Sequence, residues 1–444
     1  MIKLKNSKIF VLGMARSGYE VSKYLSKYDN EIIVTDAKEQ ESSRVQELES
    51  LGIKVVITDK PEELLNNTYN VVIKNPGIKY TNPLIVKANS LSIPVINEVE
   101  AASYFFPENL QVIGVTGSNG KTTTTNLINE MLKAAGKKVI MAGNMGIPVC
   151  SILNDLDSDT ILLLEISIQQ LCNMNHFKTN VSVLTNLTPT HIDFLDTYEN
   201  YKNTKKRIFN NHTDKDIAIL NLNNNDEIEL TKDIKSHKVY FSSSCNTDIC
   251  INDDYITYFG EKIIKLEDIK LQGMHNYENA CCAIGAVKHY NVDNAAIIKV
   301  LKEFGGVEHR LEYVRTLNNV EYYNDSKATN TVSTTIALKA FNKPTILIMG
   351  GLDRGHSFEP LNDYMKNVKL VVCYGQTKNR IEKWADSLNI AVKVVDNLHD
   401  ATMYANSKAL PGDVILLSPA CASWDQYKCF EDRGTEYKTI VNGL

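Results

Sequence analysis

The sequence has no long hydrophobic run. A helix that crosses a membrane needs about 18 or more consecutive apolar residues, and no run in the 444 residues approaches that length. The first residues, 1–13, lead straight into an expected strand, without the apolar stretch and the small-residue cleavage site of a secretory signal peptide. We therefore expect no membrane partner, no secretion and a cytoplasmic location.

Paired cysteines and an excess of one charge are missing as well. The nine cysteines, an odd number, include no C-x-x-C pair, which disfavours a disulfide framework or a zinc site and fits reduced thiols in a protein core. The 48 Lys and Arg against 53 Asp and Glu give a net charge of −5. This balance argues against a nucleic-acid partner bound across the whole surface, but it leaves a local basic cleft open.

What is present indicates a globular chain of several domains. Hydrophobic residues make up 43% and charged residues 23% of the sequence, as in ordinary globular proteins. At about 150 residues per domain, a chain of 444 residues is expected to form three domains.

The most informative stretch is a glycine-containing loop at 117–123, G-S-N-G-K-T-T. An apolar strand is expected before it, at 112–116, and a helix with one apolar stripe after it. Gly117 and Gly120 allow a tight turn, so that backbone N–H groups and the helix N-terminus can face phosphate oxygens.

Two side chains of this loop add chemistry. Lys121 brings a full positive charge, and the hydroxyl of Thr122 lies where a Mg²⁺ ligand is needed. Although the loop is shorter than the standard G-x-x-x-x-G-K-[ST] form, it predicts a nucleoside triphosphate site that also includes Ser118, Asn119 and Thr123. The alternative is a glycine loop that caps the helix by chance.

Residues 8–36 predict a strand, a loop, a helix and a second strand. The loop G-M-A-R-S-G begins at Gly13 and resembles the dinucleotide fingerprint, with Ala15 at the middle glycine and Asp36 at the end of the second strand. Because Ala15 hinders the approach of a pyrophosphate, we favour another nucleotide-bearing ligand, or a structural turn, over a nicotinamide or flavin cofactor. Further strands are expected at 71–73 and 94–98.

The second region continues the alternation of strands and helices. Glu165 ends an expected strand at 161–165, and His191 follows another at 181–186. Ligands gather at the carboxyl ends of strands in open α/β sheets, so both side chains are expected near the phosphates held by Lys121. For Glu165 alone, a surface position is the competing interpretation. The basic helix expected at 198–209 has a solvated face as its alternative.

The rest of the chain predicts a helix at 273–287 and then a third α/β region. On the helix, Asn276 and Asn279 share a face and suit an adenine edge or a helix cap. Before it, residues 210–272 are expected to form strands and polar loops, with a turn at 221–227. The glycine-rich segment 303–310 predicts a domain boundary. Beyond it, four expected strands, each ending in a polar loop of small residues, lie at 320–324, 345–349, 370–374 and 414–417. Such loops at one sheet edge suggest two substrates brought together around one triphosphate.

These motifs together resemble the bacterial Mur ligases and, among them, the member that adds D-glutamate. The resemblance runs from about residue 8 to residue 440. It rests on V-T-G-S-N-G-K-T-T (115–123), G-N-M-G (143–146), L-E-I-S (164–167), T-N-L-T-P-T-H-I-D (185–193), E-H-R (308–310), N-D-S-K-A-T-N (324–330) and S-P-A-C-A-S-W-D-Q (418–426).

The resemblance implies an α/β fold of three domains: an N-terminal Rossmann-like domain for the UDP end (1–103), a central P-loop ATPase domain with a mostly parallel sheet (104–306) and a C-terminal Rossmann-like domain (307–444). It implies that ATP phosphorylates the carboxylate of UDP-N-acetylmuramoyl-L-alanine and that the amine of D-glutamate attacks the acyl phosphate, in the bacterial cytoplasm, during peptidoglycan precursor synthesis. Such phosphoryl transfer needs positioning and charge neutralisation. We expect a monomer.

The resemblance also implies a role for each matching residue. Lys121 holds phosphates, Thr122 and Glu165 serve one Mg²⁺, and His191 serves a second. The residues expected on ATP are Gly117, Ser118, Asn119, Gly120, Lys121, Thr122, Thr123, Asn276, Asn279, Arg310 and Asp325. Those expected on the UDP-linked substrate are Gly13, Ala15, Arg16, Ser17, Asp36, Asn75, Asn144 and Ser167, and those on D-glutamate are Lys327, Thr329, Arg354, Ser423 and Phe430.

A lysine on the basic helix carries a further implication. The family's Y-x-x-x-K spacing selects Lys205, four residues after Tyr201, over Lys206. In the relatives this lysine is carbamylated by CO₂, which turns an ammonium into an oxygen ligand for Mg²⁺. Carbamylation requires the neutral amine, so burial and neighbouring cations are expected to lower the pKa of Lys205.

Two positions depart from the family pattern. Arg354 stands where many members have the glutamate-binding lysine, which keeps the charge but presents a planar fork. Ile168 stands where a second serine often follows Ser167. Three other interpretations stay open: another Mur-type or folylpolyglutamate-type ligase, a P-loop switch or motor, and a nicotinamide enzyme built on 11–36.

Overall fold

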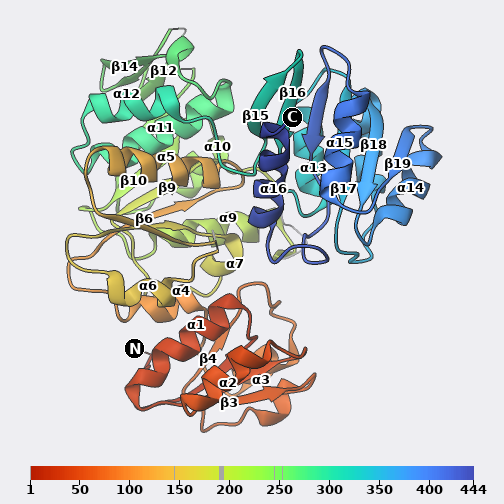
Figure 1. Ribbon diagram of the computed structural model, residues 1–444. Helices are drawn as coiled ribbons and strands as arrows, with labels where there is room; N and C mark the ends of the chain where they lie inside the picture. Colours follow the sequence, from red (N-terminus) through yellow and green to blue (C-terminus); the bar gives the residue numbers. More distant parts are fainter. Residues whose placement is uncertain (1, 145, 190–194, 245, 253) are drawn as a thin grey trace. The chain divides into compact units, whose positions relative to one another are not determined.

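The computed structural model describes the whole chain except residues 1, 145, 190–194, 245 and 253. It contains three sheets with helices packed against them, and most strand pairs are parallel (Figure 1). By its internal contacts the chain divides into two compact units, Met1–Phe304 and Gly305–Leu444. The α/β fold expected from the sequence is confirmed.

The first sheet is small and fully parallel. Its order is β3-β2-β1-β4-β5, with strands β1 (Lys8–Leu12), β2 (Glu31–Asp36), β3 (Lys54–Ile57), β4 (Val71–Lys74) and β5 (Val95–Ile96). Its helices are α1 (Arg16–Leu25), α2 (Ser42–Ser50) and α3 (Pro83–Ser90). Strand β3 was not predicted, because it is a short edge strand without fully buried residues.

The second sheet has nine strands and contains the glycine loop. Its order is β14-β13-β12-β11-β10-β9-β6-β8-β7, built from β6 (Gln111–Thr116), β7 (Val139–Gly143), β8 (Ile161–Glu165), β9 (Val181–Leu184), β10 (Ile217–Asn221), β11 (His237–Ser242), β12 (Ile249–Ile251), β13 (Tyr255–Tyr258) and β14 (Glu261–Lys265). The last two strand pairs of this sheet, β12 with β13 and β13 with β14, are antiparallel.

The remaining described α-helices of the first unit follow α3 in the chain, and the sequence predicts the apolar stripe of one of them, α5. They are α4 (Glu98–Ser103), α5 (Lys121–Ala134), α6 (Val149–Ile152), α7 (Ile168–Leu171), α9 (Tyr198–Lys206), α10 (Asn225–Leu230), α11 (Met274–Lys288) and α12 (Asn294–Glu303). In α5, Leu127, Ile128 and Met131 are buried in the core that α11 shares. The turn predicted at 221–227 is only partly correct, because Asn224 caps α10, which begins at Asn225.

Residues before and after position 104 share contacts within the first unit. One apolar core contains buried side chains from Leu4 to Leu230. The buried carboxylate of Glu100 on α4 accepts hydrogen bonds from the backbone N–H groups of Asn175, His176 and Phe177 at 2.9, 2.7 and 3.0 Å. These contacts join segments that are distant in sequence, and the domain boundaries proposed at 103/104 and 306/307 stay predictions.

The third sheet has six strands in the order β15-β16-β20-β17-β18-β19. They are β15 (Glu312–Leu317), β16 (Val320–Asn324), β17 (Thr345–Gly350), β18 (Val368–Tyr374), β19 (Ala391–Val394) and β20 (Val414–Leu417), with helices α13 (Thr331–Lys339), α14 (Lys378–Ser387), α15 (Leu398–Lys408) and α16 (Phe430–Asn442). The four strands predicted from the sequence are the adjacent parallel ones, β16, β20, β17 and β18, so their carboxyl ends meet at one edge. The two strands that the sequence did not indicate, β15 and β19, lie at the edges and are less buried.

In the described part of the chain, every helix is too short or too polar to cross a membrane.

Candidate active site

The glycine loop has the geometry that its sequence predicts. Gly117 and Gly120 have φ angles of 146° and 79°, which side-chain-bearing residues rarely adopt. A Cβ on Gly117 would lie 2.0 Å from Thr185 Oγ1, and a Cβ on Gly120 would lie 2.2 Å from Asn279 Oδ1. Glycine is therefore required both for the turn and for the close approach of these side chains.

The segment that follows β9 holds the glycine loop through hydrogen bonds. Ser118 N–H donates to Asn186 O at 2.9 Å, and Asn119 N–H donates to Asn186 Oδ1 at 2.9 Å. The Thr185 hydroxyl donates to Asn119 O. Thr185 and Asn186 were not among the predicted site residues, although they stand directly at the end of a predicted strand, where such contacts are common.

Lys121 and Thr122 begin helix α5. The Lys121 ammonium donates to Gly117 O at 2.9 Å and to Ser118 O at 3.0 Å, so its charge lies directly over the loop. Thr122 is buried, Thr123 is half-buried and Asn119 is exposed. Positive charge therefore gathers at a helix N-terminus, which suits a bound polyphosphate.

Glu165 ends β8 and is buried. Its Oε1 accepts a hydrogen bond from Asn144 Nδ2 at 2.7 Å, while its Oε2 has no hydrogen-bond partner among the described residues. An ordinary surface position for Glu165 is thus wrong. A buried carboxylate oxygen without a partner is costly unless it binds a cation, so the site fits a hard metal ion such as Mg²⁺.

Lys205 points inward from α9 and is only 1% exposed. Its Nζ donates to Thr116 Oγ1 at 2.8 Å and to Gly117 O at 3.0 Å. Burial and the nearby Lys121 charge hold the pKa of Lys205 well below its usual value, although Glu165 opposes the shift. The solvated interpretation of this helix is wrong for Lys205 but holds for Lys206, which forms an ion pair with Asp233.

Tyr201 lies one turn before Lys205 and is also buried. Its hydroxyl is 2.7 Å from Ser118 Oγ, so two side chains of α9 reach the glycine loop. His191 lies outside the described residues, and its role stays a prediction.

The loop after β1 borders a separate cavity of about 320 Å³. Gly13, Asp36 and Asn75 line it, whereas Ala15, Arg16 and Ser17 are not part of its described lining. Asp36 Oδ2 accepts a hydrogen bond from Met14 N–H at 2.8 Å, so this carboxylate holds the turn as well as facing the cavity.

The next three residues of this loop have other contacts. Ser17 Oγ donates to Asn75 Oδ1 at 2.7 Å. Arg16 is exposed, and its Nη1 donates to Gly146 O at 3.3 Å. Ala15 precedes α1 as its N-cap residue. The structure thus connects this loop with the G-N-M-G segment that carries Asn144.

Ser167 caps the short helix α7. Gln170 N–H donates to Ser167 Oγ at 3.3 Å, and Ser167 N–H donates to Gln170 Oε1 at 2.9 Å, which is a capping box. Ile168 is buried in the apolar core. The departure from the family pattern therefore places an apolar core residue where a hydroxyl often stands.

The two asparagines of α11 differ in surroundings. Asn279 is buried, and its Oδ1 accepts from Thr124 Oγ1 at 3.3 Å, which places it against the helix of the glycine loop. Asn276 is half-buried, and its Nδ2 donates to Gln272 O at 2.8 Å. Contact with adenine stays a prediction for both.

In the second unit, Arg310, Asp325 and Lys327 line a cavity of about 150 Å³. Asp325 is 4% exposed and accepts hydrogen bonds from Ser418 Oγ and Leu311 N–H at 2.7 and 3.2 Å. Burial raises the pKa of Asp325 to about 7, although these hydrogen bonds oppose the rise. The structure thus brings three of the predicted residues together.

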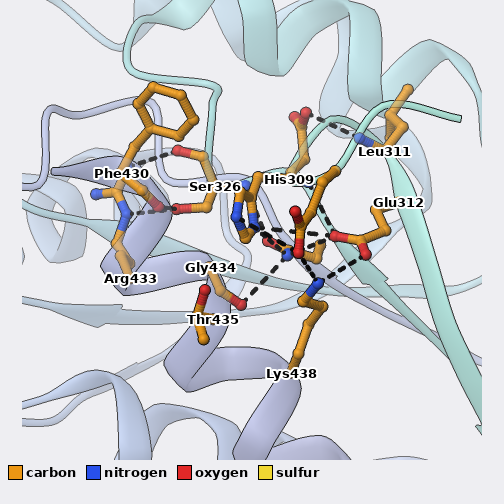
Figure 2. A network of polar contacts seen from close by, with 12 residues as sticks. His309, Leu311, Glu312, Ser326, Phe430, Arg433, Gly434, Thr435 and Lys438 are labelled. Atoms are coloured by element: carbon orange, nitrogen blue, oxygen red, sulfur yellow. Dashed lines mark hydrogen bonds and ion pairs between the residues drawn. The ribbon is translucent and has the colours of Figure 1, made fainter. Parts of the chain in front are cut away.

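A fully buried arginine on α16 holds the loop that carries Ser326 (Figure 2). Arg433 donates through Nε and Nη2 to Ser326 Oγ and Ser326 O, at 2.9 and 2.8 Å, and through Nη1 to Cys421 O at 3.1 Å and Gly350 O at 3.4 Å. Ser326 Oγ also donates to Phe430 O at 2.8 Å. Arg433 was not predicted, because its charge gives no sign in the sequence that it is buried.

A second polar cluster lies beside it (Figure 2). Asn324 Nδ2 is 2.9 Å from His309 Nδ1 and donates to Glu312 Oε2 at 3.0 Å. Glu308, His309 and Glu312 lie close enough to share a metal ion, but Lys438 forms ion pairs with both carboxylates. The ammonium already supplies the positive charge, so we assign no metal there. The cluster holds the backbone next to Arg310.

The remaining residues predicted for D-glutamate lie on loops of the second unit. Ser423 is buried, and its hydroxyl has no hydrogen-bond partner among the described residues. Thr329 is half-buried after Lys327, whose Nζ lies 5.7 Å from the Phe430 ring centre. Arg354 is exposed, and its guanidinium carbon lies over the Trp424 ring. An unpartnered buried hydroxyl and the charges of Lys327 and Arg354 suit an anionic ligand.

Comparisons with known families cover nearly the whole chain. Residues 7–97 match the MurD-like N-terminal domain of Mur ligases, residues 115–287 the Mur ligase middle domain, and residues 309–421 the Mur ligase glutamate ligase domain.

Curated proteins and solved structures agree with these matches. The chain is 42% identical over 446 aligned residues to the UDP-N-acetylmuramoylalanine--D-glutamate ligases of Bacillus cereus (strain AH187) and Bacillus anthracis (strain A0248), with 100% of this chain and 99% of each relative covered. Its fold is similar to that of the UDP-N-acetylmuramate-alanine ligase MurC from Thermotoga maritima, with a TM-score of 0.59, 18% identity and 98% and 99% of the two chains covered. For MurF from Acinetobacter baumannii the TM-score is 0.57, at 14% identity and 98% and 93% coverage. The chain therefore belongs to the Mur ligase family and, within it, to the group of UDP-N-acetylmuramoylalanine--D-glutamate ligases.

Proposed function

We propose that this enzyme uses ATP to join D-glutamate to UDP-N-acetylmuramoyl-L-alanine in the bacterial cytoplasm, as a step of peptidoglycan precursor synthesis. The observation that carries the proposal is the meeting of Lys121, Glu165 and Lys205 at one glycine loop, in a chain that matches D-glutamate ligases over its full length. We further propose that the enzyme acts as a monomer, which gel filtration can test.

The glycine loop binds the triphosphate of ATP in this proposal. The backbone N–H groups of α5 and the Lys121 ammonium would neutralise the β- and γ-phosphates, because both lie at the start of the helix. Asn276 and Asn279 would lie on the adenine side, and Asp325 would take the ribose.

The side chains around the loop fit two Mg²⁺ ions. Thr122, Glu165, His191 and Lys205 as its carbamate would hold them, and the buried, unpartnered Oε2 of Glu165 supports this assignment. Bound Mg²⁺ would neutralise charge on the phosphates. Lys205 contributes through its low pKa, because only a neutral amine reacts with CO₂.

The UDP-linked substrate would bind at the loop after β1. Gly13, Asp36 and Asn75 line the cavity there, and Arg16 connects the loop with the segment of Asn144. Asn144 and Ser167 would hold the muramoyl-alanine part. A carboxylate oxygen of this substrate attacks the γ-phosphorus, and ADP leaves.

D-glutamate completes the reaction. Its amine attacks the carbonyl carbon of the acyl phosphate, loses a proton and displaces inorganic phosphate. Lys327, Thr329, Arg354, Ser423 and Phe430 would orient it by its two carboxylates, so that only one enantiomer presents its amine to the carbonyl carbon.

Phosphate release from ATP tests this proposal. The purified protein is incubated with ATP, UDP-N-acetylmuramoyl-L-alanine and a panel of amino acids that includes both enantiomers of glutamate. We expect release with D-glutamate only. Release with a different amino acid would identify another ligase of this family. Equal turnover of L-glutamate would contradict the proposed binding of D-glutamate by its two carboxylates. Steady release without acceptor would favour a switch or motor.

Shifts of the thermal midpoint test ligand binding at the cavity lined by Gly13, Asp36 and Asn75, independently of turnover. UDP-N-acetylmuramoyl-L-alanine is expected to raise the midpoint, because it binds only the folded state. NAD is expected to leave it unchanged, and a rise with NAD would revive the nicotinamide interpretation.

A further inference from the structure

An exposed tryptophan supports the arginine that replaces the family's lysine. Trp424 is 62% exposed, and the Arg354 guanidinium carbon lies 4.7 Å from its ring centre. Trp424 directly follows Ser423, whose buried hydroxyl has no partner among the described residues. The pair thus stands beside a buried polar group whose hydrogen-bonding capacity is unused among the described residues.

The contacts of Arg354 differ from those of the basic residues that pair with acids in its unit. Among the described residues, it forms no hydrogen bond or ion pair that would use its N–H groups. The nearby Arg380 forms an ion pair with Asp353 and donates to His356 O. Other basic side chains of the unit are paired with acids: Lys343 with Glu321, Lys369 with Asp413, Lys378 with Asp396 and Lys438 with Glu312. Arg354 therefore has its donors available.

The two loops that carry the pair are held in register. Gly350 N–H donates to Pro419 O at 3.1 Å, and Leu352 N–H donates to Ala422 O at 2.9 Å. Leu352 and Ala422 form an isolated antiparallel bridge. The loop after β17 is thus fixed against the loop after β20, two residues before each member of the pair.

The position of a guanidinium over a ring face has a directional consequence. The ring attracts the cation through its face, whereas all five N–H donors lie in the guanidinium plane and remain open. They can accept a carboxylate through two parallel hydrogen bonds. A lysine ammonium in the same place would act as a point charge without this orientation.

We propose that Trp424 is a positioning residue that holds the Arg354 guanidinium in the orientation that receives one carboxylate of D-glutamate. This inference rests on the function proposed above and deepens it, because it makes Trp424 a determinant of amino-acid specificity. In this chain, the Trp424 ring would thus orient the arginine that stands where many members of the family have a lysine.

The test separates affinity for D-glutamate from turnover. In Trp424→Leu the KM for D-glutamate is expected to rise about three- to tenfold, the range of a cation–π contact that is partly desolvated. The kcat and the KM values for ATP and UDP-N-acetylmuramoyl-L-alanine should stay within about twofold. Trp424→Phe keeps a ring and should stay within about twofold of the unchanged enzyme in every constant.

A double variant and a matched control sharpen the test. In an Arg354→Gln background, Trp424→Leu should add no further rise in KM, because the two residues act as one unit. Tyr364→Leu is the control. Tyr364 lies on the 3-10 helix Glu359–Asn367 and contacts Lys339 at 4.6 Å, so its loss removes a similar contact elsewhere and should leave the KM for D-glutamate unchanged.

Fluorescence gives a readout that does not depend on turnover. Trp424 is one of two tryptophans, and the other, Trp384, is buried. With ADP and UDP-N-acetylmuramoyl-L-alanine present, D-glutamate should change the emission of the unchanged enzyme and not that of Trp424→Phe.

Three results would overturn the inference: an unchanged KM for D-glutamate in Trp424→Leu, an equal rise in all three KM values, or an additive effect in the Arg354→Gln background. Each of these leaves the unchanged enzyme active with D-glutamate. Failure of the proposed function would instead be seen as no turnover of D-glutamate by the unchanged enzyme, so the two failures are distinguishable.

Discussion

At the scale of single residues, the charge of Lys121 is placed to act on a transition state. Its ammonium contacts two loop carbonyls, at 2.9 and 3.0 Å, and it is not part of an apolar core. Its loss should therefore affect the rate far more than the fold.

We expect Lys121→Ala to reduce kcat by roughly two to three orders of magnitude, since one lost electrostatic contact of this kind costs about 3–4 kcal/mol. The thermal midpoint should stay near that of the unchanged enzyme. Lys133→Ala is the control, because Lys133 lies on the same helix and pairs with Glu130 at the surface. Near-normal activity of Lys121→Ala at unchanged stability would contradict the nucleotide site.

Lys205 and Lys206 are neighbours with opposite surroundings. Lys205 is buried against the glycine loop and has a strongly lowered pKa, whereas Lys206 pairs with Asp233 at the surface. The lowered pKa of Lys205 favours the neutral amine that carbamylation requires.

We predict that Lys205→Ala loses most activity and partly recovers it in acetate, whose carboxylate can fill the vacated position as an oxygen ligand. Lys206→Ala should be nearly silent. If Lys206→Ala loses activity and Lys205→Ala does not, the register chosen from the Y-x-x-x-K spacing is wrong. If both variants keep their activity, the mechanism does not use a carbamate.

At the scale of elements, the two ends of α5 offer a matched pair of glycines. Gly120 precedes the helix with φ 79°, and a Cβ there would meet Asn279 Oδ1 at 2.2 Å. Gly136 follows the helix with φ 71°, and a Cβ there would meet nothing within 4 Å. An alanine would therefore meet similar backbone strain at both positions, but only at Gly120 would its Cβ collide with a neighbouring side chain.

Gly136→Ala should therefore cost only the left-handed strain of about 1–2 kcal/mol and leave ATP binding intact. Gly120→Ala should lower the thermal midpoint further and weaken binding of ADP at least tenfold, because the loop must shift away from α11. Calorimetric melting and ADP titration measure both. Equal effects of the two changes would argue against the close packing of α11 on the loop.

His212 connects three segments of the central sheet region. Its Nε2 lies 2.7 Å from Thr179 Oγ1 and 3.1 Å from Ser182 Oγ, and its Nδ1 lies 2.7 Å from Ser236 Oγ. Burial lowers the pKa of His212 to about 4. Below its ordinary pKa of about 6.5, the unfolded chain therefore binds a proton that the folded chain does not.

The free energy of unfolding of the first unit should fall as the pH drops from about 6.5 to 4, by roughly 3 kcal/mol from this residue. Glu98, whose pKa burial raises to about 7, contributes with the opposite sign. The measurement is therefore the difference between the unchanged protein and His212→Asn in urea unfolding across this range. A difference that does not change with pH would contradict a neutral buried His212.

At the scale of the whole molecule, the apolar cores indicate which segments of the chain can fold as separate fragments. Two core clusters lie entirely within Gly305–Leu444, on the two faces of its sheet. In contrast, one cluster of the first unit draws buried residues from Leu4 to Leu230.

We expect the fragment 305–444 to fold alone with a single cooperative transition. A fragment 104–304 should be less stable and bind a hydrophobic dye, because it lacks the part of its core that the first hundred residues supply. Circular dichroism melts of the separate fragments check this. A stable, dye-free fragment 104–304 would support the predicted boundary at 103/104 as a folding boundary.

The sequence by itself determined the local parts of this protein. The strand, glycine loop and helix around Lys121, the buried strand that ends at Glu165 and the four parallel strands of the third sheet were all predicted. Periodicity, glycine conformation and turn chemistry act over a few neighbouring residues, and a sequence displays them directly.

Tertiary structure alone decided which polar side chains are buried and what they contact. The family spacing selected Lys205 over Lys206, but only the structure shows that Lys205 is buried and reaches Thr116, 89 positions away. Arg433 reads as an ordinary basic residue, but it is buried against Ser326 and the ends of two other loops. Burial, pKa and hydrogen-bond partners depend on segments that are distant along the chain, so no local pattern encodes them.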